Sequence, residues 1–341
     1  MLRDVVVIGS GISGLSCAYE LARAGASVEI VARSLPPATT SNIAAAFWYP
    51  YFAFPRARVL SWAARSWQRF ATLAETPATG VRMAEAVEFV RDASPPRPWW
   101  CDSAANVRAA PSDGLPDGMA AAWRFVAPIV DTRKYMPWLV HAVAALGVRT
   151  VQREVRQLSD LSEAYRGAVV VDCAGLGARE LVPDPAVEPI RGQLVLVENP
   201  GLSRVLLDET NPAGVTYVVP RGDDCVLGGT THPGDDDQRT RIADRDAVLA
   251  RCIALEPRLA GARLLADVVG LRPGRASVRL DHTPAGPDQP AVVHNYGHGG
   301  AGVTLSWGCA EAVARLVAQE HPGMYRPAAF AHGTLLGAPR R

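Results

Sequence analysis

The sequence predicts an α/β fold in which a parallel, doubly wound sheet is assembled from separated segments of the chain. A β-branched run, Val5–Ile8, leads directly into a glycine-rich turn and a helix with apolar periodicity. A second glycine-rich junction between a strand and a helix, at residues 292–303, stands near the other end. Short apolar runs between these ends are typical of an antiparallel sheet. We therefore expect a second, α+β domain with a mixed or antiparallel sheet.

The N-terminal turn carries Gly9, Gly11 and Gly14 in G-x-G-x-x-G spacing. Gly9 permits the tight turn, Gly11 lets the backbone approach a pyrophosphate, and Gly14 lets the helix pack close to the strand. The helix N-terminus adds unpaired N–H groups and partial positive charge. This combination predicts a Rossmann-type dinucleotide site. The acidic residue that usually binds the ribose is missing, because Ala32 and Arg33 stand at the end of the second strand.

The remaining chain alternates helical and strand-like patterns in an order that fits this plan. Asp131 or Thr132 is expected to cap a helix that Gly147 ends. Helices are expected at residues 15–24, 59–73, 131–146, within 235–255, and at 303–319. Strands are expected at residues 28–31, 81–90, 122–126, 148–151, 168–172, 193–197, 216–219, 225–227 and 292–295.

A long segment rich in Pro, Ser, Thr and aromatic residues, 33–55, follows the second strand. A loop of this length inside a compact domain is usually functional. Thr40 and Ser41 can donate hydrogen bonds to phosphates. The aromatic residues after them either form the wall of a substrate pocket or belong to the core, and both interpretations stay open at this point. They are Phe47, Trp48, Tyr49, Tyr51 and Phe52.

The composition argues against several classes of function. A net charge of +1 over 341 residues gives no footprint for nucleic acid or for an anionic membrane. The six cysteines form no C-x-x-C pair, which argues against a zinc site or a disulfide framework and fits a reducing compartment. The first strand begins too close to Met1 for a signal peptide, and no apolar run could span a bilayer. We therefore expect a cytoplasmic protein without a metal, a nucleic-acid partner or a membrane partner.

The C-terminal junction repeats the chemistry of the first. Gly299, Gly300 and Gly302 permit a close backbone approach, and a helix that begins near Val303 directs its N-terminus at the same crevice. Two such N-termini from opposite ends of one chain suit a long, bipolar cofactor. One takes the pyrophosphate, and the other takes a ring system that becomes negative on reduction, which favours FAD over NAD.

Seven segments, in this order across nearly the whole chain, resemble one known family, the FAD-dependent D-amino-acid oxidases and D-aspartate oxidases. Arginine almost wholly replaces lysine, which suggests a bacterial member. The segments are VVVIGSGISGLS at 5–16, AAAFWYPY at 44–51, RGQ at 191–193, YVVP at 217–220, LGGT at 227–230, GLRPGR at 270–275 and HNYGHGGAGVTLSWGCA at 294–310.

The resemblance implies roles for individual residues. Arg272 matches the arginine that binds the substrate carboxylate, Tyr217 matches a tyrosine that binds the same group, and Gly300 matches the glycine whose carbonyl receives the amine. These three are the candidate catalytic residues, and together with Tyr49 they form the expected substrate site. Cofactor contacts are expected at Gly9, Gly11, Ile12, Gly14, Arg33, Thr40, Ser41, Ala45, Phe47, Val155, Gly299, Gly300, Gly302, Val303 and Thr304.

The resemblance also implies an activity. D-amino acids would be oxidatively deaminated, by hydride transfer from Cα, to 2-oxo acids with ammonia and hydrogen peroxide from O₂, and no side-chain base is needed once the amine is neutral. The sequence departs from the family where Ala213 stands in place of a lid tyrosine and Thr231 in place of an arginine of the D-aspartate oxidases. These changes predict a preference for neutral D-amino acids with sizeable side chains, unless Arg221 or another nearby arginine reaches the pocket as a cation.

Three other hypotheses stay open. An oxidase of glycine, D-aspartate or other small amines would use the same fold. An NAD-dependent dehydrogenase would use the N-terminal fold alone, and Arg272 and the C-terminal junction argue against it. A non-catalytic nucleotide-binding protein is the remaining alternative.

The expected domains follow the motifs. The FAD-binding domain comprises residues 1–49, 128–182 and 268–321, and the substrate domain comprises 50–127 and 183–267. Residues 322–341 form a C-terminal tail. The candidate assembly is a homodimer.

Overall fold

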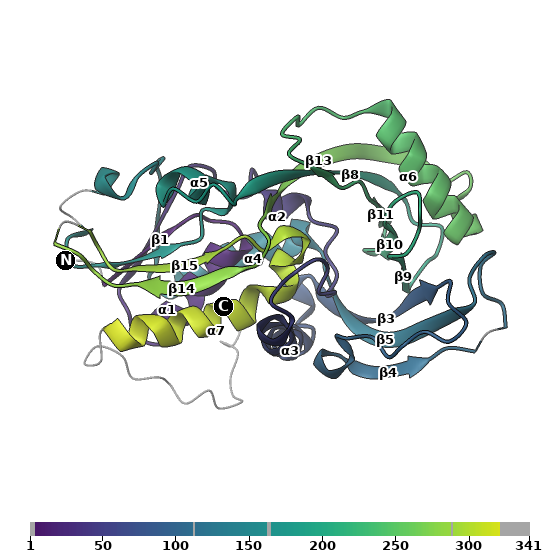
Figure 1. Cartoon of the computed structure of the whole chain (residues 1–341), viewed down its shortest axis with the longest axis horizontal. Coiled ribbons are helices and arrows are strands. Elements are labelled where there is room, and N and C mark those ends of the chain that lie inside the picture. The colour runs from purple at the N-terminus through teal and green to yellow at the C-terminus, as the bar shows by residue number, and fades with distance from the viewer. Residues whose placement is uncertain (1–3, 112, 162–164, 288, 321–341) are drawn as a thin grey trace, which may run out of the picture.

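Two β-sheets organise the chain in the computed structural model, which describes residues 4–111, 113–161, 165–287 and 289–320. The sheets lie next to each other along the long axis of the molecule, with helix α3 (Arg56–Leu73) below the region where they meet (Figure 1). The predicted α/β class is confirmed. The expected C-terminal tail lies outside the described residues.

The first sheet has the strand order β14-β15-β7-β1-β2-β6. Its strands run parallel except for the antiparallel pair β14 and β15. They come from three separated parts of the chain, as predicted, while the domain boundaries stay a prediction. The strands are β1 (Val5–Ile8), β2 (Val28–Ala32), β6 (Arg149–Gln152), β7 (Val169–Asp172), β14 (Arg279–Thr283) and β15 (Val292–Tyr296).

Both faces of this sheet are covered, which explains why β1 and β7 are continuous β-branched runs with every residue buried. Val5 and Val7 pack in the core that contains α1 (Ile12–Arg23), α4 (Thr132–Ala145) and α7 (Gly302–Glu320). Val6 and Ile8 belong to a separate core on the other face, which includes Leu181 of the short helix α5 (Ala178–Leu181). No helix among the described residues is long and apolar enough to cross a membrane.

The second sheet has nine strands, in the order β12-β8-β11-β10-β9-β3-β5-β4 with β13 paired to β8. It is mixed, because β3 and β9 run parallel and the other pairs run antiparallel. Helix α6 (Ile242–Leu255) packs against it through Val248 and Cys252. The strands are β3 (Val81–Val90), β4 (Ala105–Ala109), β5 (Ala121–Val130), β8 (Glu188–Glu198), β9 (Val205–Asp208), β10 (Thr216–Pro220), β11 (Asp224–Gly228), β12 (His232–Pro233) and β13 (Leu264–Gly274).

Strands β8 and β13 connect the two halves of the molecule (Figure 1). They are paired from the Leu264–Val197 position to the Gly274–Glu188 position, well beyond the runs that the sequence predicted as strands. The short helix α2 (Thr40–Ile43) contacts β13. This arrangement carries Arg272, near the end of β13, to the boundary between the sheets.

Candidate active site

A cavity of about 750 Å³ lies where the glycine-rich junctions of the first sheet meet the second sheet. Every predicted site residue except Gly14 lines it. Those residues are Gly9, Gly11, Ile12, Arg33, Thr40, Ser41, Ala45, Phe47, Tyr49, Val155, Tyr217, Arg272, Gly299, Gly300, Gly302, Val303 and Thr304.

The N-terminal junction forms one end of the cavity. Gly9 has φ +108°, and a Cβ there would overlap the carbonyl oxygen of Cys173. A Cβ on Gly14 would overlap the carbonyl oxygen of Gly9, so Gly14 serves the close packing of helix and turn rather than the cavity wall. Gly11 is the N-cap of α1, and the first helical N–H, on Ile12, donates to Ser41 Oγ at 2.9 Å. The Ser41 hydroxyl hydrogen is left to donate into the cavity.

The second junction places the start of α7 at the cavity. A Cβ on Gly300 would lie 2.8 Å from Tyr51 Cδ1, so the glycine admits the tyrosine ring. Thr304 Oγ1 donates to the Tyr49 carbonyl at 2.9 Å and accepts from the Tyr49 N–H at 3.1 Å. The Thr304 side chain is therefore engaged in holding the backbone of Tyr49.

Arg272 presents a guanidinium with unused donors to the cavity. Its Nη1 donates to the carbonyl of Thr230 at 3.0 Å, and among the residues that the structure describes no carboxylate pairs with it. A Cβ on Gly192 would overlap Nη1, Cζ and Nη2, so the guanidinium lies directly on that glycine. A partly buried arginine without a counter-ion is unusual, because a desolvated charge normally acquires a partner.

Tyr217 stands beside this arginine. A Cβ on Gly228, its partner on β11, would overlap the Tyr217 ring. Burial raises the pKa of Tyr217, while the charge on Arg272 opposes that rise. The phenol is therefore a neutral hydrogen-bond donor at ordinary pH, next to a cation.

Aromatic rings form the wall between the two junctions. The Phe47 ring lies 6.0 Å from the Tyr49 ring and 6.2 Å from the Tyr217 ring, measured between centroids. Tyr51 also lines the cavity. The prediction that Phe52 belongs to this wall is wrong, since its side chain is 65% exposed. Its backbone turns with φ 44°, and the ring packs edge-on against Tyr51 outside the cavity lining.

Two carboxylates that sequence reasoning missed lie behind Tyr49. Its hydroxyl is 2.8 Å from Glu88 Oε1 and 2.7 Å from Glu209 Oε2. One phenol hydrogen can be donated to only one of them, so the second short contact requires a proton on a carboxyl group. Burial raises the pKa of Glu88 to about 7 and also raises the pKa of Glu209. No motif marks these residues, because Glu88 lies in β3 and Glu209 follows β9, and the two meet only in the fold.

The cavity edge formed by the ends of β2 and β6 is polar. Arg33 forms an ion pair with Glu154, Nη1 to Oε1 at 3.5 Å, and the Arg33 side chain is 70% exposed. Exposed pairs of this kind contribute little to stability, so Arg33 is free to contact a ligand. Glu154 also lines this edge of the cavity. It lies near Ala32 and Arg33, which stand where an acidic residue usually binds the ribose, and the sequence prediction missed it.

Two titratable residues near the site, Arg221 and His298, bear on its charge. Arg221 does not line the cavity, because it is buried in a pair with Asp224 at 2.7 Å and so supplies no cation there. Burial lowers the pKa of His298 to about 4, which leaves this cavity residue neutral. Within the described ranges, no cluster of three or more His, Cys, Asp or Glu residues could hold a metal ion.

These features fit FAD. Glycines at one end of the cavity leave room for a pyrophosphate, and the first turns of α1 and α7 contain no acidic side chain that would repel it or a negative ring. The aromatic and glycine-rich far end suits a flat ring system.

Comparison with known proteins gives the same result. A model of the FAD dependent oxidoreductase family matches residues 4–316. The chain is 51% identical to a D-amino-acid oxidase of Rubrobacter xylanophilus, covering 93% of this chain and 96% of that one. It is 43% identical to a D-amino-acid oxidase of Streptomyces coelicolor, covering 92% and 96%. A glycine oxidase from Geobacillus kaustophilus shares the fold, with a TM-score of 0.77 at 20% identity over 98% of this chain and 99% of that one. The predicted resemblance is confirmed, and the chain belongs to the D-amino-acid oxidase family of FAD-dependent oxidoreductases.

Proposed function

We propose that this protein is an oxidase that converts a D-amino acid, O₂ and water to a 2-oxo acid, ammonia and hydrogen peroxide. The observation that carries the proposal is the guanidinium of Arg272, which faces the cavity and has no carboxylate partner among the described residues. A carboxylate is the planar anion that matches its fork of donors. The family supplies the redox cofactor.

The residues of the chain would bind and orient the substrate. Arg272 holds the carboxylate by two parallel hydrogen bonds, and the Tyr217 hydroxyl adds a third donor. The carbonyl of Gly300 receives the amine, which fixes the direction of the Cα–H bond. When bound, FAD supplies the acceptor for the hydride and passes the electrons to O₂. The chain would contribute orientation and electrostatics, and no side-chain base is assigned.

The cofactor would be held from both ends. Gly9, Gly11 and Ile12 would contact the pyrophosphate, and Ser41 would donate its free hydroxyl hydrogen to it. Glu154 would accept a hydrogen bond from the ribose. Other expected contacts are Gly14 through packing alone, and Arg33, Thr40, Ala45, Phe47, Val155, Gly299, Gly300, Gly302, Val303 and Thr304 at the cavity wall.

We further propose that neutral D-amino acids with sizeable side chains are preferred. Phe47, Tyr49 and Tyr51 offer an aromatic wall to an apolar side chain. The position of the missing lid tyrosine is held by Ala213, and Arg221 is engaged elsewhere. The other arginines among the described residues that line the cavity are Arg33, Arg153 and Arg156, which follow β2 and β6 at the far edge. We therefore propose that an acidic side chain beside the aromatic wall would have no second cation within reach.

Anaerobic reduction of the purified protein tests the proposal. A flavin spectrum should bleach under nitrogen with D-valine and stay unchanged with L-valine. Bleaching by glycine but not by D-valine would support the small-amine alternative, and dependence on added NAD would overturn the flavin assignment. Hydrogen peroxide should appear when air is admitted.

Compartment and assembly remain proposals as well. All six cysteines are free and buried, which supports action in the reducing cytoplasm. A homodimer is the proposed assembly, and sedimentation velocity of the FAD-loaded protein tests it.

A further inference from the structure

The R-G-Q segment of β8, residues 191–193, directs its side chains to two different sides of the sheet. Side chains alternate along a strand, so Arg191 and Gln193 point to one side and Gly192 points to the other. Gly192 lines the cavity, whereas Arg191 and Gln193 are completely buried. Arg191 and Gln193 are thus two fully buried polar residues that lie outside the cavity lining.

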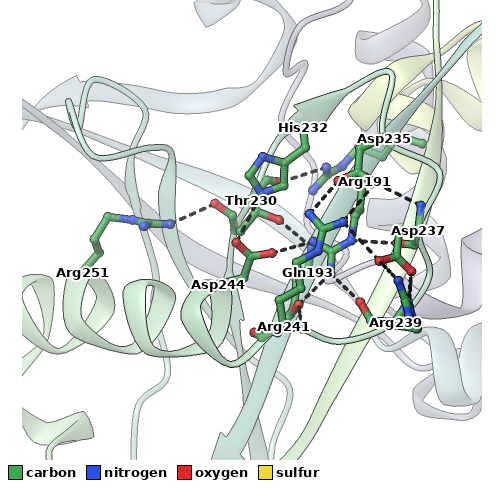
Figure 2. Close-up of polar contacts among 12 residues, drawn as sticks. Arg191, Gln193, Thr230, His232, Asp235, Asp237, Arg239, Arg241, Asp244 and Arg251 are labelled. Carbon is green, nitrogen blue, oxygen red and sulfur yellow. Dashed lines mark hydrogen bonds and ion pairs between the residues drawn. The ribbon is translucent and has the colours of Figure 1, made fainter.

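Arg191 donates four hydrogen bonds to surrounding groups, as Figure 2 shows. Its Nε donates to the carbonyl of Asp237 at 2.7 Å, and its Nη1 donates to Asp244 Oδ2 at 2.6 Å. Its Nη2 donates to the carbonyl of Arg239 at 2.7 Å and to Gln193 Oε1 at 2.9 Å. Because Arg191 is fully buried and makes four hydrogen bonds, moving its guanidinium would break several of them, so it helps to hold the groups that it contacts.

Gln193 is fixed in turn and holds Thr230. The Gln193 side chain accepts from the Arg241 N–H at 2.8 Å and donates to the Arg241 carbonyl at 2.9 Å. Its backbone N–H donates to Thr230 Oγ1 at 2.8 Å, and its carbonyl accepts from the Thr230 N–H at 3.4 Å. Figure 2 shows Thr230 next to this group.

Thr230 connects the network to Arg272, which lines the cavity. Its carbonyl accepts a hydrogen bond from Arg272 Nη1 at 3.0 Å, and the Tyr217 side chain is also hydrogen-bonded to Arg272. On the other side of β8, the guanidinium lies on Gly192, where any side chain would displace it. The Gly192 surface and the Thr230 carbonyl therefore help to orient the Arg272 guanidinium, and the R-G-Q segment places both of them.

We propose that Arg191 and Gln193 are positioning residues, which act through Thr230 to aim the guanidinium of Arg272 at the substrate carboxylate. Neither touches the cavity. The inference rests on the proposed function, because it takes Arg272 as the carboxylate anchor. The network would keep Arg272 in its binding orientation before the substrate arrives, which reduces the ordering cost of binding.

A matched pair of variants at Thr230 tests the link. Thr230→Val keeps the shape of the side chain but removes the acceptor for the Gln193 N–H, and Thr230→Ser restores it. The probes are benzoate, a carboxylate that cannot be oxidised, and benzamide, its neutral analogue. Their dissociation constants are measured with FAD-loaded protein from changes in the flavin spectrum. Melting temperature and FAD content report on folding.

For Thr230→Val we expect benzoate to bind at least fivefold more weakly and benzamide to change less than twofold. KM for D-valine should rise more than kcat falls, and Thr230→Ser should return both constants to within twofold of the wild type. Equal weakening of benzoate and benzamide, or unchanged benzoate binding in folded Thr230→Val, would overturn the proposal. If Thr230→Val does not retain FAD, Gln193→Met carries the same test with the same limits.

Arg272→Ala separates this inference from the proposed function. If Arg272→Ala leaves benzoate binding unchanged, the carboxylate anchor itself is wrong. If Arg272→Ala weakens benzoate while Thr230→Val and Gln193→Met do not, the anchor stands and only the positioning role fails.

Discussion

Among the residues of the site, Arg272 has the role that a single substitution tests most directly. We expect Arg272→Ala to retain FAD and to lose about 3 kcal/mol or more in kcat/KM, roughly 100-fold, because a carboxylate in a water-poor site would lose its cation. Arg272→Lys should recover only part of the loss, since an ammonium cannot form the paired hydrogen bonds. Steady-state kinetics with D-valine measures both. Near-wild-type kcat/KM in the alanine variant would remove Arg272 from the site.

Gly192 tests the surface beneath that guanidinium. Gly192→Ala places a methyl group where Nη1, Cζ and Nη2 lie, and the flexible arginine end can move away. We therefore expect KM for D-valine to rise tenfold or more while the melting temperature changes little. Gly286→Ala is the matched control, because its Cβ would lie 3.7 Å from the nearest atom and outside the cavity lining. Equal kinetics for the two variants would contradict the described contact.

Protonation of Glu88, behind the pocket wall, should make the stability of the protein depend on pH. Burial raises its folded-state pKa from 4.5 to about 7, so between these values the folded protein binds more protons than the unfolded chain. Stability contributed by this group is therefore present at low pH and is lost as pH rises toward 7. Glu88→Gln should melt at a higher temperature than the wild type at pH 8, and that advantage should shrink by pH 5. Thermal melts of FAD-loaded protein test this, with Glu75→Gln on the surface as control; parallel curves for Glu88→Gln and wild type would contradict it.

The glycine-rich motifs could be placed at the cavity from local sequence alone, whereas Arg272 and Tyr217 were placed there by the family resemblance. Gly9 and Gly11 are required by backbone geometry, which is local and therefore visible in the sequence. Glu88 and Glu209 carry no such signal, because their contact with Tyr49 arises only when separate strands pack. The prediction for Phe52 was wrong because its local sequence resembles that of the wall residues around it. The backbone bends at this residue and turns the side chain outward.

Among the secondary-structure elements, those with strong local patterns were predicted well. β1 and β3 match the expected ranges, and Asp131 caps α4 by accepting from the Arg133 N–H, as one of two expected residues. β9 and β14 were missed, because they are short and gain their strand character from paired neighbours. β13 stays paired with β8 through Pro273 to Gly274, although the local sequence does not favour a strand there.

Helix α1 provides a prediction at the scale of an element. Gly11 stands at its N-terminus and lines the cavity, and a Cβ there would lie 3.1 Å from Ser41 Oγ. A branched side chain would project where a pyrophosphate must approach, so Gly11→Val should purify without FAD while its far-ultraviolet circular dichroism stays native. Flavin absorbance relative to protein absorbance measures the occupancy. Full occupancy in a folded Gly11→Val protein would place the nucleotide elsewhere.

At the scale of the whole molecule, the cavity is shared between the two sheets. The parallel sheet contributes the glycine-rich junctions, and the mixed sheet contributes Tyr217, Gly192 and Arg272 on β10, β8 and β13. Both halves were expected from the order of the motifs along the chain. The carboxyl groups of Glu88 and Glu209, which the mixed sheet places behind the pocket wall, were not expected. They bear directly on which substrates the pocket favours.

The apolar wall and the nearby carboxyl groups of the assembled pocket both disfavour acidic substrates. An apolar wall gains about 0.8 kcal/mol for each CH₂ group that it buries. A second substrate carboxylate would lose more than this, because burying a charge without a partner is costly. Arg221 is held by Asp224 and does not line the cavity. The Glu88 and Glu209 carboxyl groups behind Tyr49 add negative charge as pH rises.

We therefore expect D-valine and D-methionine to exceed D-aspartate and D-glutamate by tenfold or more in kcat/KM, about 1.4 kcal/mol. D-asparagine is the control for size, since it has nearly the shape of D-aspartate without its charge, and it should fall on the side of the neutral substrates. Because Glu88 has a pKa of about 7, the ratio of D-asparagine to D-aspartate should increase between pH 6 and pH 8. Glu209→Gln should reduce that ratio by removing one of the two carboxyl groups near the wall. D-aspartate as the best substrate at pH 8 would mean that a cation outside the described pocket reaches the side chain.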